Sequence, residues 1–160
     1  MVDVTTLACA IYASGVSDDA LEPDEIALWH AFKRVGEAVS AAVERDILTA
    51  SGLTGPEFGV LTRLVDLGDG RLRQQELATS MRWDKSRLSH QLTRMQKRDL
   101  VSRITADPST VIVEITDAGR AALGPARPAH ARSIRENLLT RLDRSQRAAF
   151  GEALGTILGE

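Results

Sequence analysis

The chain has 160 residues, of which 26% are charged and 43% hydrophobic, ordinary values for a globular protein with one core. Its single cysteine, Cys9, excludes a disulfide bond within the chain and favours a reducing, cytoplasmic location. No apolar run approaches the roughly 18 residues of a membrane-spanning helix, and the apolar segment 7–13 lacks the basic residues that precede it in a signal peptide.

The net charge of −2 is distributed unevenly along the chain. Between Arg71 and Arg103 there are nine basic and three acidic residues, a local net charge of +6, so the remaining residues carry −8. Salt screens charges that lie more than about 8–10 Å apart at physiological ionic strength. The basic segment can therefore attract a polyanion such as DNA although the chain as a whole is acidic.

The first 50 residues predict an arm followed by a long helix. Residues 1–23 show helical periodicity only over 7–13, so we expect a flexible N-terminal arm. From residue 24 to about 51, apolar residues recur at helical spacing between Ile26 and Ile47, which predicts one long helix. Its length indicates that it packs on more than its own subunit.

Three shorter elements are predicted next. A cap and Pro56 lead into a helix over residues 57–67, which the glycine-containing turn 68–70 ends. Leu72 is expected in a short strand or bridge. Helices over residues 74–81 and 85–98 then follow, joined by a tight turn, which is the pattern of a helix-turn-helix.

The second of these helices, residues 85–98, carries two different faces. Asp84 is a typical N-cap, and Trp83 and Leu88 are spaced as a hydrophobic staple. Leu88, Leu92 and Met95 recur at i, i+4 and i+7, so they are expected to face a core. The opposite face carries hydroxyls, an imidazole and cations but no carboxylate, and thus suits a polyanion. Its residues are Ser86, Ser89, His90, Thr93 and Lys97, with Arg94 at the edge.

Residues 101–105 and 111–116 alternate between apolar and polar side chains around the turn 106–110, which predicts a β-hairpin. A helix-turn-helix followed by a hairpin is a winged helix. A further helix is expected from residue 117, interrupted or kinked at Gly124-Pro125 and Pro128 because proline lacks a backbone donor.

The helix after these prolines is predicted to resume as an apolar ladder of Ile134, Leu138 and Leu142 at i, i+4 and i+8. A capping box over residues 143–146 then begins the last helix, in which Phe150, Leu154 and the pair 157–158 are apolar.

This order of elements resembles the multiple-antibiotic-resistance regulator (MarR) family over roughly residues 24–159. The most specific matches are the Leu77-Ala78 helix, the helix 86–98 leading into Arg98-Asp99-Leu100-Val101, and the segment 115–119 (Ile-Thr-Asp-Ala-Gly) that closes the wing. The fold class expected is mainly α with a small β-hairpin wing (α+β). The resemblance implies a winged-helix domain over 24–160, with a DNA-binding lobe at about 54–116 and dimerisation helices at about 24–51 and 117–159.

In the family the terminal helices intertwine across a two-fold axis, and the wing usually carries an arginine at its tip that enters the minor groove. The resemblance therefore implies an obligate homodimer. Here the wing tip lacks that arginine, and its candidate DNA contacts are Asp107, Ser109 and Thr110.

Groove chemistry assigns roles to the basic and hydroxyl residues. Residues expected to reach base edges or thymine methyl groups are Ser86, Arg87, His90 and Thr93. Residues expected to hold phosphates are Arg73, Arg82, Ser89, Arg94 and Lys97, and Lys85 is a further DNA-binding candidate.

The predicted function is sequence-specific transcriptional regulation through double-stranded DNA, with a homodimer on a pseudo-palindromic operator whose half-sites are about 34–36 Å apart. The resemblance implies repression that a small, often anionic or aromatic effector relieves. Trp29 and His30 are candidates for lining the effector pocket. The alternative is that Trp29 belongs to the core and His30 is exposed.

Two other functions remain open. Some family members sense peroxides through an N-terminal cysteine, but no basic residue near Cys9 favours its thiolate. The missing wing arginine and the overall acidity are also compatible with a winged helix that binds proteins instead of DNA.

An enzyme is not expected, because the chain has no Gly-rich phosphate loop, no Gly-x-Ser-x-Gly and no His-Glu-x-x-His sequence. No cofactor is expected either. His30, His90 and His130 are far apart and lack the spacing of metal ligands, so no metal site is predicted.

Overall fold

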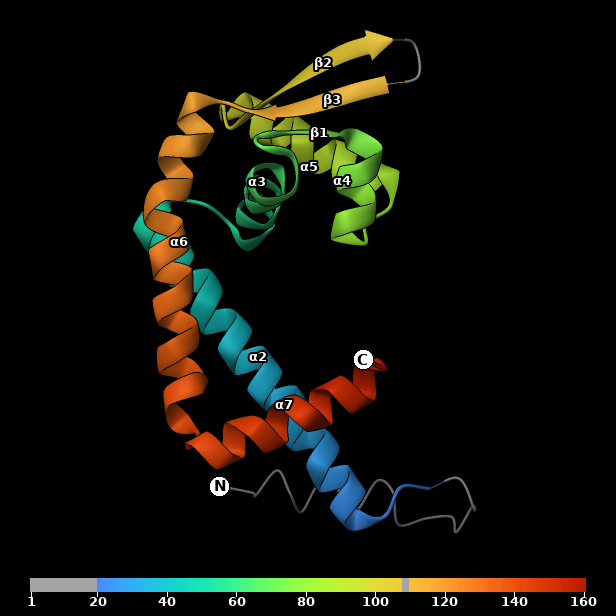
Figure 1. The fold of residues 1–160 in the computed structure, drawn as a ribbon, viewed down its shortest axis with the longest axis vertical. Helices are drawn as coiled ribbons and strands as arrows, with labels where there is room; N and C mark the ends of the chain where they lie inside the picture. Colours follow the sequence, from blue (N-terminus) through green and yellow to red (C-terminus); the bar gives the residue numbers. More distant parts are fainter. Residues whose placement is uncertain (1–19, 108–109) are drawn as a thin grey trace, which may run out of the picture. The chain divides into compact units, whose positions relative to one another are not determined.

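The computed structural model describes residues 20–107 and 110–160 (Figure 1). Most of the predicted arm, together with Cys9 and Ser109, lies outside these residues. The chain divides into two compact units, with the boundary between Ser40 and Ala41. No helix of the described residues has the length and apolar character needed to cross a membrane.

The first long helix, α2 (Pro23–Ser51), has the predicted bounds to within one residue. Its described residues up to Ser40 include no buried side chain, whereas Ala42 and Ile47, which belong to the second unit, are buried. The apolar side chains of α2 are therefore buried only near its C-terminal end, in the part that belongs to the second unit.

The second unit contains the winged helix. Its helices are α3 (Gly55–Gly68), α4 (Gln74–Met81) and α5 (Lys85–Lys97), and its strands are β1 (Arg71–Arg73), β2 (Val101–Asp107) and β3 (Thr110–Ile115). The strands form an antiparallel sheet in the order β1-β3-β2, and the three helices lie together on one side of it (Figure 1). The predicted helix-turn-helix and hairpin are confirmed, and Leu72 pairs with Val113 as part of a third strand.

Local sequence signals set the ends of these helices. The Thr54 backbone N–H donates to Glu57 Oε2 at 2.9 Å, and the Glu57 N–H donates to the Thr54 hydroxyl, so a capping box begins α3. Asp84 caps α5 by accepting from the Arg87 N–H at 2.8 Å, as predicted. Strand β2 runs two residues further than predicted, β3 begins and ends one residue earlier than predicted, and the register of the pair is irregular between Thr105 and Asp107.

The core of the second unit lies between the helices and the sheet. Trp83, the residue before the α5 cap, is partly buried against this core. Among its completely buried members are residues of α3, α4, α5 and β3, namely Val60, Leu61, Leu64, Leu77, Leu88, Leu92, Met95 and Val113. Because α5 contributes three of these residues, its orientation is fixed by the core and its opposite face is left at the surface.

The prediction that prolines interrupt the helix after the wing is wrong. Helix α6 (Asp117–Asn137) runs through Pro125 and Pro128 without a break. Each proline removes one backbone donor, while burial of Leu123 before them and of Ala129 after them rewards a continuous helix. Tertiary packing therefore outweighs the local cost.

The predicted ladder of Ile134, Leu138 and Leu142 is also wrong as a single helix. Helix α6 ends at Asn137, and a short 3₁₀ turn, η1 (Leu139–Arg141), follows before helix α7 (Arg144–Leu158). The capping box that begins α7 is confirmed, since the Gln146 N–H donates to Asp143 Oδ1 at 2.8 Å and the Asp143 N–H donates back at 3.0 Å. Because this capping box begins a new helix at Asp143, helix α6 ends before that residue.

Candidate nucleic-acid interface

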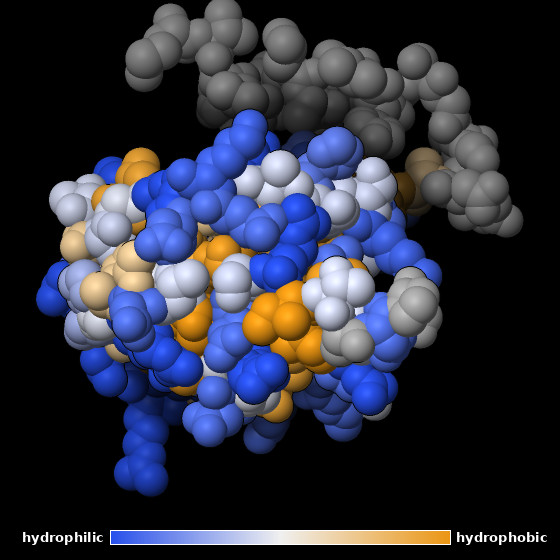
Figure 2. Space-filling model, turned by 90° about the horizontal axis from the view of Figure 1, so that it is seen from above, coloured by the Kyte–Doolittle hydropathy of each residue, from blue (hydrophilic) through white to orange (hydrophobic). Residues whose placement is uncertain are grey.

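Helix α5 separates an apolar face from a polar one. Leu88, Leu92 and Met95 are completely buried, as the periodicity predicts. Eight of the ten DNA-binding residues predicted outside the wing tip lie on α5, and these eight are exposed except Ser89, which is partly buried. They are Lys85, Ser86, Arg87, Ser89, His90, Thr93, Arg94 and Lys97. The surface seen from above the wing is mostly hydrophilic, with hydrophobic residues in separate patches (Figure 2).

The N-terminal end of α5 is organised by the turn that precedes it. Arg82, a predicted phosphate contact, is exposed and adopts a left-handed conformation (φ 53°) that closes the turn after α4. The guanidinium of Arg87 lies over the Trp83 ring, 4.4 Å from its centroid, in a cation–π contact. The ring supports the guanidinium from one face, and the N–H groups at its edge remain suited to hydrogen-bond acceptors in a groove.

A hollow of about 340 Å³ lies beside the start of α5. It brings together three predicted DNA contacts from separate segments: Arg73 at the end of β1, Lys85 in the first turn of α5 and Thr110 at the start of β3. The other lining residues are Gln74, Gln75, Ala78, Leu88 and Val111. Arg73 and Lys85 place two cations in the lining of this hollow.

The wing strand β2 contributes a cation that the site prediction did not include. Arg103 donates from Nε to Gln96 Oε1 at 2.6 Å and from Nη2 to the Thr93 hydroxyl at 3.1 Å. Strand alternation gives the signal that could have found it, because Arg103 lies on the same face of β2 as the buried Val101 and so points toward α5. The residue therefore links the wing to α5.

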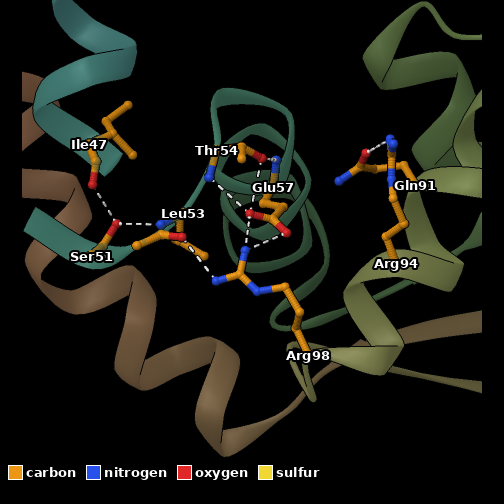
Figure 3. A network of polar contacts seen from close by, with 9 residues as sticks. Ile47, Ser51, Leu53, Thr54, Glu57, Gln91, Arg94 and Arg98 are labelled. Carbon is orange, nitrogen blue, oxygen red and sulfur yellow. Dashed lines mark hydrogen bonds and ion pairs between the residues drawn. The ribbon is translucent and has the colours of Figure 1, made fainter. Parts of the chain in front are cut away.

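Arg98, at the end of α5, was counted in the basic segment but has a structural role (Figure 3). Its Nη1 donates to both carboxylate oxygens of Glu57, at 2.6 and 2.8 Å, and its Nη2 donates to the Gly52 carbonyl at 2.9 Å. Glu57 is only 4% exposed, so this ion pair neutralises a buried carboxylate. The local charge of +6 thus overstates what the surface offers to DNA.

Further contacts involve Arg94 of α5 and residues of the three strands. Arg94 donates to the buried side chain of Gln91, which holds its guanidinium beside α5 (Figure 3). Arg71 pairs with Glu114 across the sheet at 3.9 Å. At the wing tip, Asp107 and Thr110 are opposite each other in the strand register.

The comparisons with known proteins address the fold and the family. Residues 57–106 match a family model described as a domain of unknown function (DUF7343). No curated protein matches the sequence. Among solved structures, the chain is similar to AbsC, a MarR family transcriptional regulator from Streptomyces coelicolor, with 29% identity and a TM-score of 0.77. That match covers 88% of this chain and 95% of AbsC.

A second MarR family regulator from the same organism, Sco3205, was solved in complex with DNA and has 25% identity and a TM-score of 0.78. The match covers 90% of this chain and 91% of Sco3205. The chain has the fold of the MarR family of transcriptional regulators. Its structural neighbours are transcriptional regulators and not enzymes, in agreement with the sequence prediction.

The MarR fold also occurs in the organohalide-sensing regulator RdhR-CbdbA1625, solved in a form with bound 2,4-dichlorophenol. That protein shares 18% identity with this chain over 91% of the chain and 85% of its own length, with a TM-score of 0.72.

Trp29 and His30, the two candidates for lining an effector pocket, are both exposed in the first unit. The Trp29 ring stacks on Phe32 with centroids 6.0 Å apart, and Lys33 Nζ lies 6.0 Å from the Trp29 ring centroid. Since Trp29 is 52% exposed, the alternative that it belongs to the core of the chain is not supported.

Over residues 20–107 and 110–160, no group of three or more His, Cys, Asp or Glu side chains could hold a metal ion. His130 instead packs on the ring of Phe58, with centroids 4.9 Å apart, and so joins α6 to α3.

Proposed function

We propose that this chain is a sequence-specific, DNA-binding transcriptional regulator that binds a pseudo-palindromic operator as a homodimer. The observation that carries the proposal is the exposed face of α5, which holds cations, hydroxyls and an imidazole on a helix without any acidic residue. A helix with its apolar side buried and such a polar side exposed is suited to the major groove. The similarity to Sco3205, solved with DNA, supports this use of the fold.

The proposed DNA contacts fall into two groups, those to base edges and those to phosphates. Ser86, Arg87 and His90 lie exposed along the first two turns of α5, where they would face base edges. The cations at the two ends of the surface would hold phosphates, with Arg73 and Lys85 around the hollow and Lys97 in the last turn. Arg82, Ser89 and Arg94 would add further backbone contacts.

A second copy of the chain would cover apolar surfaces that one copy leaves open. Helix α7 has no buried residue, and Ile157 is 76% exposed. In the first unit, Leu28 is 73% exposed and Phe32 is also exposed. Apolar residues gathered on helices in this way mark interaction surfaces. A two-fold dimer would place two copies of α5 on successive major grooves.

The dimer would act as a repressor whose DNA affinity a small aromatic or anionic effector lowers. The stacked pair of Trp29 and Phe32 with Lys33 beside it supports such a ligand chemistry, and RdhR-CbdbA1625 binds 2,4-dichlorophenol. An effector can shift the equilibrium only if it binds more tightly to a dimer whose α5 helices are wrongly spaced for DNA.

The test is fluorescence-anisotropy binding of the full chain to DNA upstream of its own gene and to scrambled DNA, each at two salt concentrations. His90→Ala should cost about 1–3 kcal/mol at the operator and relax specificity. Lys97→Ala should weaken binding to all sequences alike and reduce the salt slope by about 1. A folded dimer that binds neither DNA would contradict the proposal and favour a winged helix that binds proteins.

A further inference from the structure

The hydroxyl of Thr93 is occupied within the protein. It donates its proton to the Ser89 carbonyl at 2.9 Å and accepts from Arg103 Nη2 at 3.1 Å. A threonine hydroxyl has one proton and two acceptor positions, so this one cannot donate to a base and retains a single acceptor position. Thr93 is nevertheless exposed on the polar face of α5. Its methyl group is the part that these contacts leave unused.

Arg103 selects this arrangement. A threonine in a helix divides between two χ1 rotamers, because its hydroxyl can bond to the carbonyl three or four residues earlier. Arg103 is fixed by its second bond, from Nε to Gln96 Oε1 at 2.6 Å, and it originates on β2, whose register places it opposite Val113 of the core. The guanidinium thus reaches the Thr93 hydroxyl from one side and stabilises one rotamer.

We infer that Thr93 is a specificity residue that reads thymine through its methyl group, and that Arg103 is the positioning residue that holds it in this orientation. The inference rests on the proposed function. In the major groove, thymine is the base that offers a C5 methyl group, and apolar contact with it distinguishes thymine from cytosine and the purines. The selected operator should therefore contain a thymine at a fixed position of each half-site.

The test removes one methyl group at a time from the DNA and from the protein. An operator is first selected from random duplexes with the full-length dimer, and each thymine is then replaced by uracil, which lacks only the C5 methyl. Affinity for the wild-type protein should fall about fourfold at one position in a half-site, the effect of one buried methyl group. The other thymines should respond less.

Two variants of Thr93 form the matched pair. Thr93→Val keeps a methyl group and loses the hydroxyl that Arg103 contacts. Valine in a helix has one strongly preferred χ1 rotamer of its own, so its preference for thymine over uracil at that position should remain about fourfold. Thr93→Ser keeps the hydroxyl and loses the methyl, so it should bind the two operators equally. The opposite result, in which Thr93→Ser keeps the preference and Thr93→Val loses it, would overturn the inference.

Arg103→Met separates positioning from phosphate contact. In this variant the ratio of the affinities for the thymine and uracil operators should fall toward one, while the slope of log affinity against log salt concentration should stay unchanged. A salt slope lower by about 1 with an unchanged thymine preference would show that Arg103 holds a phosphate, and would overturn its positioning role. The Thr93 pair tests the methyl contact even if Arg103→Met weakens the wing.

The outcomes also distinguish this inference from the proposed function. A dimer that selects no DNA sequence would overturn both. A dimer that selects an operator in which no thymine responds to uracil would overturn the methyl contact alone.

Discussion

Helices α5 and α7 are similar in length, 13 and 15 residues, and both begin at an aspartate N-cap, yet they are used differently. Helix α5 buries four residues, three of them in the winged-helix core, whereas α7 buries none. In α7 the apolar Phe150, Ile157 and Leu158 are all exposed. The same local signals for a helix thus lead to two surfaces of opposite character.

The difference determines which kind of surface each helix leaves exposed for a ligand or partner. The chain covers the apolar face of α5 itself, so what remains is polar and suits a polar ligand such as DNA. It does not cover the apolar face of α7, so what remains is apolar and suits another helix. Capping gives α7 its start but only a fraction of its stability, because isolated helices of about 15 residues are marginal in water.

The largest effect is expected where α5 meets the core. Leu92→Ala removes a completely buried side chain and leaves a cavity, which should lower the free energy of unfolding by about 3 kcal/mol. Urea denaturation followed by circular dichroism at one protein concentration measures it. Lys97→Ala, on the exposed face of the same helix, is the control and should change stability by less than about 0.5 kcal/mol. Equal effects would show that the two faces of α5 are not distinct.

The same kind of truncation in α7 should weaken the dimer. Ile157→Ala removes an apolar side chain that is 76% exposed in one chain, so it should raise the dimer dissociation constant by about tenfold. Sedimentation velocity over a dilution series measures this constant, and Glu152→Ala on the same helix should leave it unchanged. If Ile157→Ala leaves the constant unchanged as well, α7 does not take part in the dimer.

Sequence reasoning succeeded where the determining contacts are local. The Asp84 cap and the stripe of Leu88, Leu92 and Met95 act within about three turns, and they fixed the bounds and the exposed face of α5. The exposure of the predicted α5 residues followed from the same periodicity. Their individual roles at DNA remain predictions.

It failed where the partner is distant in sequence. Arg98 looked like one more cation for DNA, but its partner Glu57 is 41 residues away and buried. Arg103 contacts α5 only because β2 folds back along it. Pro125 reads locally as a helix breaker, yet packing on both sides keeps α6 continuous. Neither the Arg98 contact nor the packing around Pro125 leaves a periodic signal, whereas strand alternation could have indicated the direction of Arg103.

The two helices also differ in the residue that adopts the left-handed conformation at their C-terminal ends. Helix α7 is followed by Gly159 in the left-handed conformation (φ 73°), whereas the corresponding left-handed residue after α5 is Asp99 (φ 54°). The Asp99 carbonyl accepts from the Thr116 hydroxyl and its N–H donates to the Gln96 carbonyl at 3.0 Å. Both are backbone contacts, so a glycine at this position would keep them.

Asp99→Gly should therefore raise the free energy of unfolding by about 0.5 kcal/mol, because relief of the left-handed strain exceeds the larger entropy of glycine in the unfolded chain. Asp99→Asn is the control, since asparagine tolerates this conformation and removes the same charge. The difference between the two variants in urea denaturation isolates the backbone effect. If Asp99→Gly is less stable than Asp99→Asn, a side-chain contact and not backbone conformation decides which residue follows α5.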